Sequence, residues 1–123
     1  NEQLNNLYEQ NSIHLVGDEG VDRSNVGRFG GFSTDMGDMS QLMPIIHPSV
    51  LSTSGDGHGI DYVVEDYHSA VITAAKAMAL TVVDLLHGNG QKAKEIVDNF
   101  EPLLSKDAYL KLLRSMYKEE KFQ

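Results

Sequence analysis

A chain of 123 residues with a formal net charge of −8 fits one domain that is long enough to bury a core unaided. The acidic balance argues against nucleic acid or an anionic membrane surface as the main partner. The lack of cysteine excludes disulfides and thiolate metal sites, so any metal would take carboxylate and imidazole ligands. No stretch approaches the 18 or more apolar residues of a membrane span, and no signal-peptide pattern is present, so we expect a cytoplasmic protein.

The first part of the chain is predicted to be helix followed by loop. Residues 1–11 alternate apolar and polar side chains in the pattern of the tail of an amphipathic helix. A short apolar run follows at 13–16, and Gly17 is expected to end it. Residues 17–31 are rich in glycine and charge without any period, which in a compact domain indicates a functional or a disordered segment.

The next segments are predicted to be a polar loop and a strand. Residues 33–40 carry two carboxylates and three hydroxyls on what we expect to be a loop. Residues 41–53 are the best strand candidate because they are rich in leucine, isoleucine and valine. Pro44 and Pro48 interrupt that run. Since proline cannot donate to a ladder, the strand should be short, bent or at a sheet edge.

The longest apolar pattern, at residues 66–86, predicts a helix roughly 30 Å long. Gly88 stands just past the last periodic position and is a natural stop. A helix that is apolar over most of its circumference is expected to be buried. Two adjacent rows make up the apolar surface of this helix: Val71, Ala74, Ala75, Met78, Val82, Leu85 and Leu86 in the first, and Ile72, Ala79 and Val83 in the second.

Two shorter helices are predicted at the end of the chain. Residues 91–100 have one apolar face and should end near Pro102, and Ser105 or Asp107 can cap a final helix. The chain thus offers one or two strands at most, which leaves the long apolar helix without enough cover. We expect another part of the same protein, or another copy, to cover it.

His58 is the strongest single candidate for a functional residue. Glycines on both sides let backbone or ligand approach closely, and a loop ahead of a rigid helix suits a metal ligand or a general base. The alternative interpretation is that His58 is an ordinary hydrated loop residue, as most loop histidines are. The other histidines are better explained as packed, capping, helical or surface residues: His14, His47, His68 and His87.

Asp35 and Asp38 could support a metal site, although a loop carboxylate is most often a solvated turn former. No closed catalytic motif is present: there is no HExxH, no phosphate loop ending in Lys-Ser/Thr and no nucleophile elbow. Motifs of that kind therefore leave the activity open.

Four separate pieces of the chain together resemble the C-terminal part of M20-family metallo-amidohydrolases. In order they are Phe32-Ser-Thr-Asp-Met-Gly-Asp-Met-Ser-Gln-Leu-Met-Pro44, Ile46-His-Pro48, Gly57-His-Gly59 and Ala74-Ala-Lys-Ala-Met-Ala79. The most similar branch includes aminobenzoyl-glutamate hydrolases and M20 domain-containing dipeptidases. The resemblance covers roughly residues 32–86, and the order and spacing of the four pieces make it fairly specific.

The resemblance implies an α/β fold class: a fragment of a three-layer α/β/α zinc-peptidase-like sandwich, mostly helical with one or two short strands. Residues 1–123 would be the C-terminal portion of the catalytic domain, without the lid domain and the N-terminal catalytic half. His58 would take the position of the last metal-ligand histidine. The loop that lines the substrate pocket would contain Ser33, Thr34, Asp35 and Asp38. Asp38 stands where asparagine is common, and Gly59 where threonine is common.

The resemblance also implies that the other metal ligands and the general base lie outside this chain, which would hold no catalytic residue itself. A catalytic zinc needs about three protein ligands and an activated water, which His58 alone cannot supply. The parent protein would use a divalent metal, with zinc expected, to hydrolyse an amide bond of an N-acyl or aminobenzoyl amino acid or a dipeptide. The isolated chain would be inactive. Its partners would be that substrate, the remainder of the parent chain and further copies of itself, without nucleic acid or membrane.

The competing hypothesis is a non-enzymatic acidic helical module whose exposed apolar helix face is an interaction surface. A long apolar helix that is not covered fits either hypothesis, because a fragment of an α/β/α sandwich also exposes a helix face that the complete domain would bury. An apolar face of this size exceeds the few hundred Å² that a monomer tolerates, so self-association is predicted in both cases.

Overall fold

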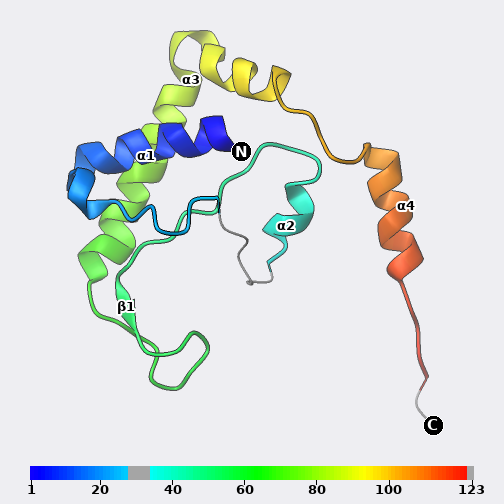
Figure 1. The fold of residues 1–123 in the computed structure, drawn as a ribbon, viewed down its shortest axis with the longest axis horizontal. Helices are drawn as coiled ribbons and strands as arrows, with labels where there is room; N and C mark the ends of the chain where they lie inside the picture. Colours follow the sequence, from blue (N-terminus) through cyan, green and yellow to red (C-terminus); the bar gives the residue numbers. More distant parts are fainter. Residues whose placement is uncertain (28–33, 122–123) are drawn as a thin grey trace.

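The computed structural model describes residues 1–27 and 34–121. This part of the chain is mostly helical and contains one two-stranded antiparallel sheet, which confirms the predicted mixed α/β class at a coarse level. The elements form an open arch: a crossed pair of helices lies on one side and the final helix on the other (Figure 1).

Helix α1 (Glu2–Val16) is longer than predicted, because the apolar run at its end continues the helix instead of forming a separate segment. The Asn1 side chain caps it by accepting a hydrogen bond from the Leu4 backbone N–H at 2.9 Å. Gly17 ends the helix, as predicted, with a φ of 77°. A single 3-10 turn, η1 (Asp18–Gly20), follows.

The predicted loop at 33–40 is partly helical, because α2 (Met36–Met39) forms one turn there. The predicted strand at 41–53 is wrong over nearly its whole length. Pro44 and Pro48 provide the reason: each lacks a backbone N–H and favours an extended residue before it, so the run is extended but cannot join a ladder.

The sheet consists of β1 (Thr53–Ser54) and β2 (Val63–Val64), with Thr53 paired to Val64. The Ser54 hydroxyl donates a hydrogen bond of 2.6 Å to the Glu65 carboxylate just beyond the ladder. The sheet is therefore a small hairpin that presents one loop, residues 55–62.

The long helix predicted for 66–86 is present as a π-helical turn, η2 (His68–Thr73), followed by α3 (Ala74–Asp98). The stop predicted at Gly88 is also present, since φ is positive at residues 88–90 and the helix axis bends there (Figure 1). The short helix predicted for 91–100 is the second arm of α3 beyond this bend.

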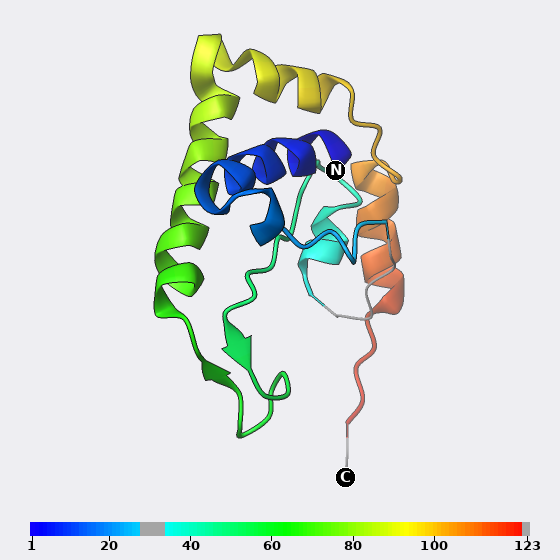
Figure 2. The ribbon, with the colours of Figure 1, turned by 60° about the vertical axis from the view of Figure 1, so that its left-hand side comes forward.

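The final helix, α4 (Lys106–Met116), begins at the predicted cap. The Ser105 hydroxyl accepts a hydrogen bond from the Ala108 backbone N–H at 3.2 Å. Helix α4 stands apart from the α1–α3 pair, and α2 lies between them (Figure 2).

The core lies where α1 crosses α3. Ala77 and Thr81 of α3 are buried at the crossing, with exposed fractions of 2% and 5%. The Asn11 side-chain amide of α1 donates a hydrogen bond to the Asp84 carboxylate at 2.9 Å and another, at 3.4 Å, to the Thr81 hydroxyl. A charge-assisted hydrogen bond therefore links the two helices beside their apolar contact.

Replacing Asn11 by alanine should lower the free energy of unfolding by about 1–2 kcal/mol, because Asp84 then loses a partly buried donor. Urea unfolding followed by far-ultraviolet circular dichroism measures the change. Asn6→Ala, at an exposed position of the same helix, is the control and should change stability by less than about 0.5 kcal/mol. Equal effects of the two substitutions would contradict the assigned role of Asn11.

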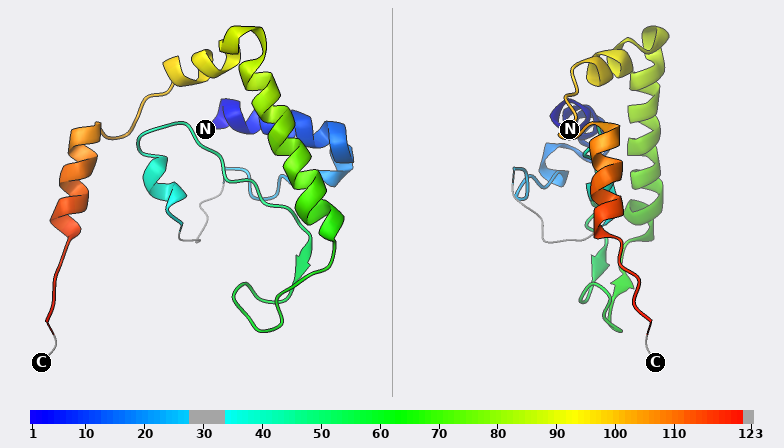
Figure 3. Two further views of the ribbon diagram at one scale, coloured as in Figure 1. Left: turned by 180° about the vertical axis from the view of Figure 1, so that it is seen from behind. Right: turned by 90° about the vertical axis from the view of Figure 1, so that its right-hand side faces the viewer.

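The prediction that the long helix is buried is wrong within the described part of the chain. The chain exposes 10086 Å² of surface, whereas a folded monomer of 13.6 kDa exposes about 6,600 Å². Seen from behind, none of the described segments lies over the first arm of α3 (Figure 3). The exposed apolar side chains along η2 and this arm are Val71, Ile72, Met78, Val82, Val83 and Leu86. This set is called the bare face of α3 below.

The expectation that no stretch approaches a membrane span needs correction. The helix from His68 to Asp98 is long and apolar enough to cross a membrane by length and composition. Core helices of soluble proteins meet the same criterion, and this helix carries Lys76 and Asp84 and bends at residues 88–90. The absence of a membrane partner stays a prediction.

Candidate functional site

The loop between β1 and β2 carries His58 and depends on glycine at two positions. The Gly59 N–H donates a hydrogen bond of 2.7 Å to the Asp56 carbonyl, which closes a turn around His58. A Cβ atom at Gly55 would collide with the Asp61 backbone, and one at Gly59 would collide with the Asp61 side chain. Of the two glycines that flank His58, Gly59 is thus required by the packing of the loop, whereas a side chain at Gly57 would meet open space.

The His58 backbone has a φ of 69°, in the left-handed region that residues other than glycine seldom adopt, although asparagine, aspartate and histidine adopt it more often than the others. Holding a histidine in this conformation costs about 1 kcal/mol or more, and such strain is concentrated at functional sites. The side chain is exposed. The loop therefore presents an imidazole outward from a tightly built turn.

Thr34, Asp35 and Asp38 lie at the start of α2, and all three are exposed. The Thr34 carbonyl accepts a hydrogen bond from the Gly37 N–H at 2.9 Å, and its hydroxyl accepts a longer one from the Met36 N–H at 3.4 Å. Asp35 precedes the helix, and its side chain makes no capping bond. Ser33 lies outside the described residues.

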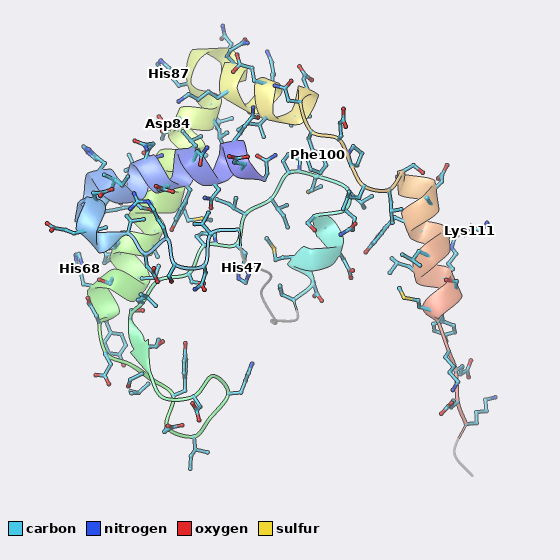
Figure 4. The ribbon with its side chains drawn as sticks, viewed as in Figure 1. His47, His68, Asp84, His87, Phe100 and Lys111 are labelled. Carbon is cyan, nitrogen blue, oxygen red and sulfur yellow. The ribbon has the colours of Figure 1, made fainter. Side chains whose placement is uncertain are left out.

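The His58 loop and α2 are not brought together, since the loop projects from the hairpin well away from α2 (Figures 1 and 2). Among the described residues no group of three or more histidine, aspartate or glutamate side chains could hold a metal ion. His47, His68 and His87 also lie at separate places along the arch (Figure 4). His58 as a metal ligand stays a prediction, because its partner ligands were expected from outside this chain.

Tyr109 is a residue of this region that sequence reasoning placed only on the apolar face of the final helix. It is buried, with 8% of its surface exposed, and lines an apolar groove of about 470 Å³. Burial raises the pKa of the Tyr109 phenol, and the negative charges of the nearby Asp38 and Asp35 carboxylates raise that pKa further. No signal in the sequence pairs a tyrosine of the last helix with a carboxylate some seventy positions earlier.

Tyr109 should therefore be the last of the tyrosines to ionise. Because its folded pKa lies above the unfolded value of about 10, its contribution to stability is complete below pH 10 and is lost as pH rises through the folded pKa. Tyrosinate absorbance titration of the wild type and of Tyr109→Phe checks this, since the variant should lack the most alkaline step. A titration curve with the same final step in both proteins would contradict it.

Comparison with known proteins found no matching family model, no matching curated protein and no matching solved structure.

Proposed function

We propose that this chain is the C-terminal portion of the catalytic domain of a metal-dependent amidohydrolase or peptidase of the M20 type. The observation that carries the proposal is the position of His58: an imidazole in a left-handed turn between glycines, in the piece of sequence that resembles the last metal-ligand motif. Strained backbone of this kind is concentrated at functional sites.

The exposed surface supports the three-layer sandwich as the complete architecture. The excess over a self-contained monomer is about 3,500 Å². The bare face of α3 is part of this exposed surface. A sheet from the remainder of the catalytic domain would cover a helix that is apolar on most sides, as in α/β proteins with helices on both faces of a sheet. In this proposal residues 1–123 supply one set of helices to that sandwich.

The residues present fit a metal centre only in part. A single exposed imidazole, with no second ligand nearby among the described residues, suits a zinc whose other ligands come from elsewhere in the parent protein. When bound, such a metal activates water and polarises the substrate carbonyl. His58 would hold one side of it, while Ser33, Thr34, Asp35 and Asp38 would line the substrate side. The general base would lie outside this chain.

The substrate class in this proposal is a small amide: an N-acyl amino acid, an aminobenzoyl amino acid or a dipeptide. A protein that carries the complete catalytic domain should hydrolyse one of these, lose activity to a chelator and regain it with zinc. The isolated chain should hydrolyse none of them. Metal-dependent hydrolysis by the chain alone would overturn the need for outside ligands, and a complete domain without any such activity would overturn the proposed function.

The second candidate function, a non-enzymatic interaction module, is supported by the same bare face. The enzyme proposal is favoured because it also accounts for the four pieces of sequence that resemble the M20 family, which an interaction module does not.

A further inference from the structure

Helix α4 has an apolar face that is packed only at its beginning. Tyr109 is the buried residue of this helix, whereas Leu112, Leu113 and Met116 are exposed by 45%, 37% and 62%. These four residues follow one another at spacings that place them on the same side of a helix. The described part of the chain therefore leaves the second half of this face without a partner.

The charge of α4 is opposite in sign to that of the whole chain. The helix carries Lys106, Lys111 and Arg114 against the single acid Asp107, although the chain has a net charge of −8. Arg114 is exposed and lies one turn beyond Leu110, at the border of the apolar face. A partner that covers this face therefore meets a positive charge at its edge.

The β1–β2 hairpin has the complementary surface. Residues 53–66 contain no lysine or arginine, and their acidic side chains are Asp56, Asp61, Glu65 and Asp66. Asp56 and Asp61 lie in the loop of the hairpin and are exposed. Between them Ile60 is fully exposed, and Tyr62 is exposed by 51%. The loop thus combines uncovered apolar side chains with negative charge, as α4 combines them with positive charge.

The two surfaces do not meet within one copy, because the hairpin and α4 lie at different ends of the arch in every view (Figures 1, 2 and 3). We infer that α4 docks on the β1–β2 hairpin of a second copy of this chain, and that its own hairpin receives the α4 of that copy. Such a reciprocal contact is the ordinary form of a two-fold dimer, and complementary charges fix its orientation. The inference concerns the chain itself and does not rest on the proposed function.

Charge reversal on either surface tests the contact. The Val82→Glu chain is the background, since its added charge opposes association through the bare face of α3. In this background Arg114→Glu and Asp56→Lys should each raise the dissociation constant about tenfold, because both contacts of the dimer become repulsive. Sedimentation over a range of concentrations measures it. Asp56→Lys is decisive, because it brings the net charge closer to zero and would strengthen an association that net charge alone controlled.

Mixing the two variants completes the test. A dimer of one Arg114→Glu copy and one Asp56→Lys copy has opposite charges at both contacts, so the mixture should recover the affinity of the background within about threefold. A variant that had merely lost its fold would not be rescued in this way. Lys92→Glu and Asp98→Lys, at exposed positions on the second arm of α3, change the net charge equally and are the matched controls. Equal affinities for test and control variants, or a mixture no tighter than its components, overturn the inference.

Discussion

Replacing His58 by asparagine in a protein that carries the complete catalytic domain should lower both the bound zinc and the rate of amide hydrolysis by about 100-fold or more. Loss of a zinc ligand removes metal and activated water together, whereas changes further from the metal cost about 10–100-fold. Asparagine is chosen because it tolerates the left-handed backbone at this position, where φ is 69°. The substitution therefore removes the imidazole without adding strain to the turn.

The matched control is His14→Asn, at an exposed position in the last turn of α1. It should leave zinc content and turnover unchanged, and both variants should keep wild-type circular dichroism. Zinc is measured by elemental analysis of the purified protein and activity by release of the free amine. A His58→Asn protein with full zinc content and normal turnover would show that His58 is not a ligand.

The isolated chain should self-associate at micromolar concentration. About 3,500 Å² of surface beyond that of a normal monomer is exposed, and at about 25 cal/mol per Å² even a fraction of its apolar part provides a strong driving force for association. The net charge of −8 opposes association, but at physiological salt such repulsion is screened beyond about 8 Å. Light scattering and sedimentation over a range of concentrations measure the oligomeric state.

A charge placed on the bare face of α3 should weaken this association. Val82 is 49% exposed, so Val82→Glu adds a charge there that is solvated in the monomer and desolvated in the oligomer. The dissociation constant should rise at least about tenfold. Gln3→Glu adds the same charge at an exposed position of α1 and should change it by less than about threefold. A wild-type chain that sediments as a clean monomer would contradict the prediction.

Local signals in the sequence predicted the helices and their ends well. Gly17, Gly88 and Ser105 all act as predicted, because a positive φ or a capping hydroxyl depends on neighbouring residues only. The strand predicted at 41–53 failed for the opposite reason. An apolar run becomes a strand only if a partner supplies hydrogen bonds, and composition does not reveal whether that partner exists.

The candidate site could be predicted in part. The glycines that flank His58 indicated a turn with an unusual backbone conformation, and the structure places that histidine in the left-handed conformation. The expected neighbourhood of Asp38 was incomplete, because its charge raises the pKa of Tyr109, which lies far along the chain. Pairing of this kind depends on how α4 returns to α2, and no local pattern encodes that return.

The sequence by itself determined where the long helix and the final helix lie, which helix faces are apolar, and which histidine is singled out by its neighbours. Those properties follow from the backbone preferences of single residues and from the period of a helix. Only the tertiary structure decided which apolar surfaces meet and which remain open, since α1 covers one side of α3 and leaves the other bare. Burial is a property of pairs of surfaces, and a single apolar face cannot specify what will cover it.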